Sequence, residues 1–211
     1  MCDIEQILKE KKWQMFSKRI FDVIASSVGI IVLFIPMLSI AIHIKKDSKG
    51  AVLFRQQRVG KDGKRFGILK FRTMKTENKG SKITVAGDER ITKYGAKLRS
   101  SKMDELPQIF NVWIGNMSFV GPRPEVPEYV ALYTEEQKKV LSIKPGITDL
   151  ASIEFRHESE LLAKADDPES YYIHEIMPTK IQHNLRYIKN MSVGYDIRLI
   201  MRTLKILRGS K

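Results

Sequence analysis

Cysteine and histidine are scarce in this chain of 211 residues. The single cysteine, Cys2, excludes a disulfide scaffold and a cysteine-based zinc cluster. The four histidines show no metal-ligand spacing such as H-x-x-x-H. No internal repeat or low-complexity segment is visible, and the 43% apolar content argues against disorder. The length fits one domain, or one domain with an appendage, that can bury a core.

Acidic residues are also in the minority, because 24 Asp and Glu stand against 37 Lys and Arg, a net charge of +13. Such an excess indicates an anionic partner: nucleic acid, a membrane surface or a phosphorylated substrate. Between Lys45 and Lys102 there are 18 basic residues and only five acids. We expect most of these cations to face lipid or solvent and a few to line a phosphate site. No nucleic-acid-binding motif is recognisable, which argues against nucleic acid.

Charge is absent altogether from residues 23–42, VIASSVGIIVLFIPMLSIAI. A helix of this length is about 30 Å long, enough to cross a bilayer core. A cleavable signal peptide is not expected, because 22 residues precede the run and no A-x-A site follows it. A plain spanning helix that tolerates Pro36 is one interpretation, and a buried helix of a soluble core is the weakest.

A re-entrant helix is the interpretation that we favour for this run. Pro36 removes a backbone donor inside the run. Basic residues, which stay on the cytoplasmic face, lie on both flanks, so both ends are expected on that face. These flanking residues are Lys18 and Arg19 before the run, and Lys45, Lys46 and Lys49 after it.

A β-hairpin is predicted after the apolar run. Two β-rich segments, about 52–59 and 65–74, flank the turn pair Asp62-Gly63.

Two amphipathic helices are expected at the ends of the chain. Residues 4–16 are predicted to be helical and interfacial, with Trp13 at headgroup depth. Near the C-terminus one helical face, which either lies on a membrane or packs on the core, carries Ile197, Ile200, Met201, Leu204 and Leu207.

Two adjacent carboxylates, Asp104 and Glu105, give the strongest local signal. Ser101 and Asp104 are candidate N-caps, and Pro107 is tolerated only in a first turn, so a helix is expected to start near Asp104. Such an N-terminus suits phosphate. Consecutive positions point about 100° apart, so the two carboxylates have different tasks: one attacks or caps, while the other holds a hard cation such as Mg²⁺. Simple capping is the alternative.

The segment 115–124, GNMSFVGPRP, follows at once. Pro122 and Pro124 restrict the backbone on either side of Arg123. A rigid loop that aims one arginine suits bidentate phosphate recognition. An ordinary Gly/Pro connector with a solvated arginine is the alternative.

Several motifs now occur in a recognisable order: KFRTM at 70–74, Arg99, SKMDELPQ at 101–108, GNMSFVGPRP at 115–124 and KPGIT at 144–148. With them the chain resembles the bacterial sugar transferases, the monotopic polyprenyl-phosphate phosphoglycosyl transferases that start glycan assembly on a lipid carrier. The resemblance runs from about Phe16 to Leu207.

The resemblance implies a ping-pong reaction on a UDP-sugar. Asp104 would attack the sugar-bearing β-phosphate and release UMP, and polyprenyl phosphate would then take the phosphosugar. Glu105 matches the family's Mg²⁺ ligand, and Arg99, Arg123 and Arg156 match its phosphate-binding arginines. The partners implied are the UDP-sugar, polyprenyl phosphate and membrane lipids, without nucleic acid, at the cytoplasmic face of the bacterial inner membrane.

The implied fold is α+β: a small monotopic membrane domain with a Pro-broken re-entrant helix, a β-hairpin and interfacial amphipathic helices. Residues 1–19 would form an N-terminal interfacial helix, 20–44 the re-entrant helix and 45–211 the catalytic domain, which works as one unit with 20–44.

The chain departs from the family pattern at three places. Ile35 precedes Pro36 where the family commonly has serine, and Asp149 stands where it has glycine. Residues 153–190 are longer than in the smallest members and acidic, and we expect them to shape the sugar or nucleotide pocket or to form a solvated loop.

Two competing functions remain open at this stage. One is a membrane-tethered, non-catalytic module that binds anionic lipid or nucleic acid; Asp104→Asn would leave its affinity intact but would stop an enzyme. The other is an ordinary glycosyltransferase, which releases UDP rather than UMP. No residue identifies the sugar.

Overall fold

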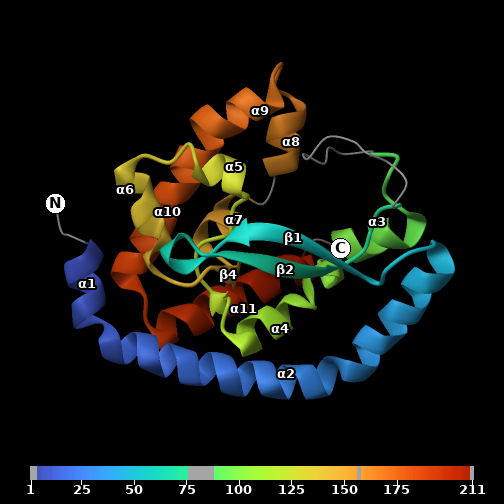
Figure 1. The fold of residues 1–211 in the computed structure, drawn as a ribbon, viewed down its shortest axis with the longest axis horizontal. Helices are drawn as coiled ribbons and strands as arrows, with labels where there is room; N and C mark the ends of the chain where they lie inside the picture. The colour runs from blue at the N-terminus through green and yellow to red at the C-terminus, as the bar shows by residue number, and fades with distance from the viewer. Residues whose placement is uncertain (1–3, 76–87, 156–157, 210–211) are drawn as a thin grey trace.

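The computed structural model describes residues 4–75, 88–155 and 158–209, and over these ranges it is mainly helical with four short strands (Figure 1). The predicted α+β class is confirmed. The helices are α1 (Ile4–Glu10), α2 (Lys12–Asp47), α3 (Lys93–Ser100), α4 (Gln108–Ile114), α5 (Pro127–Val130), α6 (Glu135–Lys138), α7 (Leu150–Glu154), α8 (Glu158–Ala163), α9 (Pro168–Tyr171), α10 (Met177–Asn190) and α11 (Val193–Gly209). The strands are β1 (Leu53–Val59), β2 (Arg65–Phe71), β3 (Ser118–Val120) and β4 (Gly146–Thr148).

Helix α2 contains the whole apolar run and extends along one side of the domain (Figure 1). Among the described residues it is the one helix long and apolar enough to cross a membrane. The predicted break at Pro36 is not observed, because α2 continues through this residue and curves instead; the missing N–H removes only one helical hydrogen bond. Nor does the helix end between residues 19 and 20, where we expected a new segment.

Polar side chains fasten the first half of α2 to the domain. Arg19 donates to the carbonyl oxygens of Val112 (2.7 Å) and Trp113 (2.9 Å) in the last turn of α4. The buried Asp22 accepts hydrogen bonds from the Ser118 hydroxyl and the Phe119 N–H, both at 3.1 Å. Lys18 pairs with Asp196 of α11. Basic residues that we expected to set the orientation in the membrane therefore also hold α2 in place.

The predicted hairpin is confirmed as β1 and β2, antiparallel, with Leu53 opposite Phe71 and Val59 opposite Arg65. Its turn uses left-handed backbone at Asp62 (φ 55°) and Gly63 (φ 73°), as the Asp-Gly pair indicates. On the edge of β2 that faces away from β1, two backbone groups form hydrogen bonds with one side chain of α4. Asn111 accepts a hydrogen bond from the Leu69 N–H and donates one to the Gly67 carbonyl oxygen, both at 2.9 Å.

The main core lies under α10 and joins α1, α7, α10 and α11 around the parallel pair β3–β4. Helix α1 buries Ile4 there, whereas Trp13 at the start of α2 is exposed. On the predicted apolar face of α11, Ile200 packs on the core, whereas Ile197, Met201 and Leu204 are exposed. Leu199, which is outside that face, is buried in the core. Contact of the exposed residues with a membrane stays a prediction.

Candidate active site

The carboxylate pair lies in a 3₁₀ turn, Met103–Glu105, rather than in the first turn of an α-helix. Helix α4 starts at Gln108, so the predicted start near Asp104 was wrong. Lys102 adopts left-handed backbone (φ 57°), which separates α3 from this turn. The predicted caps were wrong as well, because the Ser101 hydroxyl donates back to carbonyl oxygens of α3 and Asp104 caps nothing.

Asp104 is buried, with 7% of its surface exposed. Within the described residues its Oδ1 atom is buried and has no hydrogen-bond partner. Burial raises the pKa of Asp104, and the neighbouring charge of Glu105 raises it further, against the opposing effect of Lys70. A buried carboxylate oxygen without a partner is costly in an ordinary core. Such an atom indicates a site built for a ligand or a reaction rather than for packing.

Glu105 lies between two cations. Lys70 of β2 donates to its Oε1 at 2.7 Å, and the Arg123 guanidinium lies 3.5 Å from the same atom. Burial alone would raise the pKa of Glu105, but Arg123 and Lys70 outweigh it and hold the pKa at about 2. Burial lowers the pKa of Lys70, and Glu105 opposes this shift. Glu105 is therefore ionised and fixed in position.

Arg99 reaches the same region from α3. Its Nε donates to the Thr73 hydroxyl at 3.0 Å, and the Thr73 carbonyl oxygen accepts from the Thr92 N–H at the start of the helix. Gly95 allows this close approach, since a Cβ there would lie 2.2 Å from the Thr73 carbonyl oxygen. Arg156, the third arginine expected at the phosphates, lies outside the described residues.

The KFRTM motif thus contributes three separate contacts. Lys70 holds Glu105 and Thr73 holds Arg99, as described above. Arg72 is buried and donates to the carbonyl oxygens of Ser48, Lys49 and Ala51, just after α2. The motif therefore connects the end of α2 to the carboxylate pair.

The loop that carries Arg123 is fixed by the β3–β4 pair. The Gly121 N–H donates to the Thr148 carbonyl oxygen at 3.1 Å, and the Gly146 N–H donates to the Pro122 carbonyl oxygen at 3.0 Å. A Cβ on Gly121 would lie 2.4 Å from the Lys144 carbonyl oxygen. These contacts explain why the GPRP and KPGIT segments occur together, and they aim Arg123 at Glu105.

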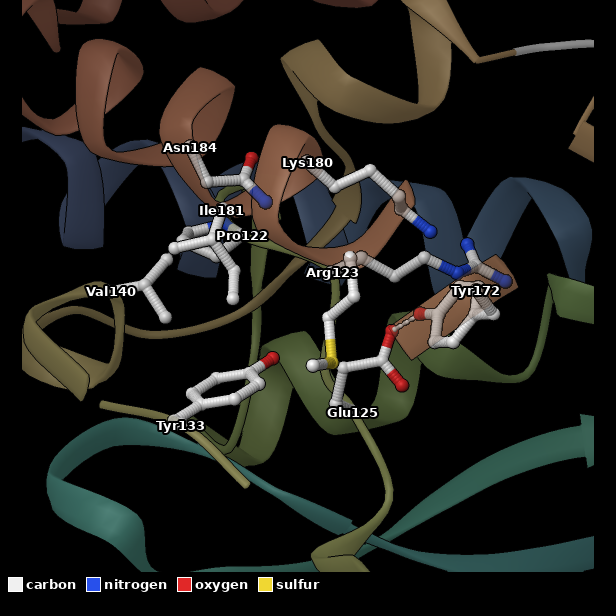
Figure 2. Close-up of a pocket in the computed structure, with 10 residues that line it drawn as sticks. Pro122, Arg123, Glu125, Tyr133, Val140, Tyr172, Lys180, Ile181 and Asn184 are labelled. Atoms are coloured by element: carbon white, nitrogen blue, oxygen red, sulfur yellow. Dashed lines mark hydrogen bonds between the residues drawn. The ribbon is translucent and has the colours of Figure 1, made fainter. Parts of the chain in front are cut away.

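A narrow pocket opens beside Arg123 (Figure 2). Half of its lining comes from residues 153–190, the segment that we expected either to shape the sugar or nucleotide pocket or to form a solvated loop: Tyr172, Met177, Lys180, Ile181 and Asn184. No sequence pattern selects Lys180, and Lys70 stands out in the sequence only as part of the KFRTM motif. The distinguishing signal, a lysine buried against an acid, exists only in three dimensions.

The departure at Asp149 has a local explanation. Its side chain caps α7 by accepting from the Ser152 N–H at 2.8 Å, and it is 1% exposed. Aspartate is a favoured N-cap, so this residue begins the helix instead of disturbing the turn.

The family model for bacterial sugar transferases matches residues 13–209. The chain belongs to the bacterial sugar transferase family. The resemblance seen in the sequence motifs is thereby confirmed.

Named relatives include a UDP-glucose:undecaprenyl-phosphate glucose-1-phosphate transferase of Klebsiella pneumoniae, 38% identical over 90% of this chain and 40% of that protein. A UDP-N-acetylgalactosamine-undecaprenyl-phosphate N-acetylgalactosaminephosphotransferase of Aeromonas hydrophila is 37% identical over 92% of this chain and 44% of its own length. The exopolysaccharide production protein PSS of Rhizobium leguminosarum is 38% identical over 91% and 96%. The chain thus spans about two fifths of the first two relatives and nearly all of the third.

Proposed function

We propose that this protein transfers a sugar-1-phosphate from a UDP-sugar to polyprenyl phosphate, through a phosphosugar bound covalently to Asp104, and releases UMP. This is an initiating step of bacterial surface glycan assembly. The observation that carries the proposal is the buried Asp104 oxygen, which has no hydrogen-bond partner among the described residues. It lies beside Glu105, against which Lys70 and Arg123 are held. Membership of the family and the names of the relatives support it.

In the first step a carboxylate oxygen of Asp104 attacks the β-phosphorus of the donor. The bond from this phosphorus to the bridging oxygen breaks, and the oxygen leaves with the α-phosphate as UMP. A carboxylate nucleophile divides one difficult transfer into two, so the two bulky substrates need not be bound together. Arg99 and Arg123 would bind phosphate oxygens and offset the charge that develops there.

In the second step an oxygen of polyprenyl phosphate attacks the same phosphorus, and the Asp104 carboxylate leaves. The acceptor phosphate lies at headgroup depth, so the site must lie next to the bilayer. Exposed apolar residues on three elements favour such a position: the outer face of α2, Trp113 and Ile114 of α4, and part of α11. We propose that α2 enters the cytoplasmic face of the inner membrane as a re-entrant helix.

The acidic residues also fit a magnesium ion. In the described part of the chain no group of three or more His, Cys, Asp or Glu side chains could hold a metal by itself. Mg²⁺, however, usually takes one or two protein carboxylates and completes its shell with substrate phosphates and water. Glu105 would hold it, because its Oε2 accepts no hydrogen bond from the described residues. When bound, Mg²⁺ would neutralise charge on the transferred phosphoryl group.

The test uses the purified protein in nanodiscs with Mg²⁺, polyprenyl phosphate and a panel of UDP-sugars, with the released nucleotide as readout. We expect UMP with one sugar, and none from Asp104→Asn. Release of UDP would contradict phosphosugar transfer and indicate an ordinary glycosyltransferase. Turnover that survives Asp104→Asn would exclude the covalent intermediate.

The same variant addresses the competing function, a membrane-tethered module that binds anionic ligands without catalysis. Such a module would bind vesicles equally well with Asp104→Asn and would release no nucleotide from any donor. The geometry argues against it, because a simple binder has no use for a buried, unpartnered carboxylate oxygen.

A further inference from the structure

Lys180 of α10 is a buried cation that the proposed reaction has not yet used. Its side chain is 8% exposed, and its ammonium donates to Oε2 of Glu158 at 2.9 Å. The same ammonium lies 5.3 Å from the centre of the Tyr172 ring, a cation–π distance. The Tyr172 hydroxyl in turn donates to Glu125 at 2.6 Å. The position of Lys180 is therefore fixed from two sides.

Arg123 and Lys180 line the same pocket, and in Figure 2 both side chains extend toward the ring of Tyr172. Arg123 also lies against Glu105, so this pocket adjoins the carboxylate pair. Two cations that face one pocket repel each other unless an anion lies between them. Each nearby carboxylate already has a partner: Glu105 lies against Arg123, Glu125 accepts from Tyr172, and Glu158, whose side chain is 28% exposed, is the single carboxylate paired with Lys180.

The ammonium of Lys180 also has unused hydrogen-bonding capacity. A lysine carries three N–H donors. Among the described residues, only the bond to Glu158 is made. A diphosphate offers several acceptor oxygens and more negative charge than one carboxylate, so it is the stronger partner for this pair of cations.

We propose that Lys180 binds the diphosphate of the nucleotide-sugar donor together with Arg123, and that Glu158 holds the ammonium in place until the diphosphate displaces it. This inference rests on the proposed function. It gives residues 153–190 a specific task in donor binding.

The position of α10 favours the donor over the lipid acceptor as the ligand. The N-terminal half of α10, with α8 and α9, lies on the side of the hairpin away from α2 (Figure 1). The acceptor phosphate arrives from the side of α2, whereas the water-soluble nucleotide sugar reaches the site from the other side.

The experiment measures steady-state kinetics of the full chain in nanodiscs, with the KM for each substrate determined separately. Lys180→Met is expected to raise the KM for the UDP-sugar about tenfold, because the loss of one charge-assisted hydrogen bond weakens binding by about this factor. The kcat at saturating donor and the KM for polyprenyl phosphate should change by less than about twofold. Lys189→Met, an exposed lysine of the same helix, is the matched control and should leave all constants unchanged.

Glu158→Gln separates phosphate binding from a structural ion pair. If Glu158 competes with the diphosphate, its neutral variant lowers the KM for the donor, opposite to the effect of Lys180→Met. If the pair only joins α8 to α10, both variants raise this KM alike, and the proposal is wrong. Because Glu158→Gln retains Lys180, it decides the question even where Lys180→Met does not fold.

Inhibition by UDP and by uridine identifies the part of the donor that Lys180 contacts. Lys180→Met should weaken inhibition by UDP and leave that by uridine unchanged. An altered KM for polyprenyl phosphate with an unchanged donor KM would assign Lys180 to the acceptor and overturn the inference. If the proposed reaction itself is wrong, the result differs from all of these, because the unsubstituted protein then releases no UMP.

Discussion

Replacing Asn111 with alanine tests how the β1–β2 hairpin is attached to α4, the helix that follows the carboxylate pair. The Asn111 side chain is 2% exposed and accepts from the Leu69 N–H while donating to the Gly67 carbonyl oxygen. These groups lie on the edge of β2 that does not pair with β1. The Asn111 amide thus makes the two hydrogen bonds that a neighbouring strand would otherwise make with Gly67 and Leu69. The next residue of β2 is Lys70, which donates to Glu105.

The expected loss follows from the two backbone groups that alanine leaves buried without partners. Each unsatisfied group costs about 1–3 kcal/mol, so Asn111→Ala should destabilise the protein by about 2–6 kcal/mol. For a chain of this size, 1 kcal/mol shifts the melting temperature by about 2–4 °C. A fall of about 4–24 °C is therefore expected.

Thermal unfolding of the detergent-solubilised protein, followed by circular dichroism, measures this shift. Asn116→Ala is the matched control, because Asn116 is exposed and its side chain makes no hydrogen bond with the described residues. Its melting temperature should change by less than about 2 °C. If the two variants have the same melting temperature, the Asn111 amide does not stabilise the edge of β2 and our account of the hairpin is wrong.

Three further outcomes are expected. Gly95→Ala forces α3 away from the Thr73 carbonyl oxygen and should cost about 1–3 kcal/mol in unfolding free energy; an unchanged melting temperature would contradict the close approach. Asp149→Ala should cost about 1 kcal/mol and Asp149→Gly only a few tenths, since both lose the cap of α7 but glycine is tolerated there; the reverse order would refute the capping role. Chelation with EDTA should stop UMP release and added Mg²⁺ should restore it, whereas turnover in EDTA would exclude the metal.

Features fixed by neighbouring residues were predicted well from the sequence. The hairpin follows from Asp62-Gly63 between two β-rich segments, and its observed strands match the expected ranges closely. The apolar run is a helix, as its composition requires. In the site, the adjacency of Asp104 and Glu105 is itself a sequence feature, and the proline-flanked Arg123 could be selected for the same reason.

Features that depend on distant residues were missed or wrong. Glu105 meets Lys70 across 35 residues, and Lys180 meets Glu158 across 22. Neither pairing leaves a periodic or local signal. The expected helix start near Asp104 is too early, because the 3₁₀ turn Met103–Glu105 precedes α4, and capping preferences do not distinguish this turn from the first turn of an α-helix.

The basic residues before the apolar run illustrate the same limit. Charge counting assigns Lys18 and Arg19 to the lipid surface, yet both contact other parts of the domain. Composition shows how many cations a segment has, and only the fold shows which of them already have partners.

The most direct measurement of the central claim is the intact mass of the protein after mixing with its UDP-sugar and Mg²⁺ in the absence of polyprenyl phosphate. Our account predicts an increase equal to one sugar phosphate, located on the peptide that contains Asp104, together with UMP. Adding polyprenyl phosphate should remove the adduct, and Asp104→Asn should never form it. UMP that appears only when the acceptor is present, with no adduct at any time, would contradict the covalent mechanism.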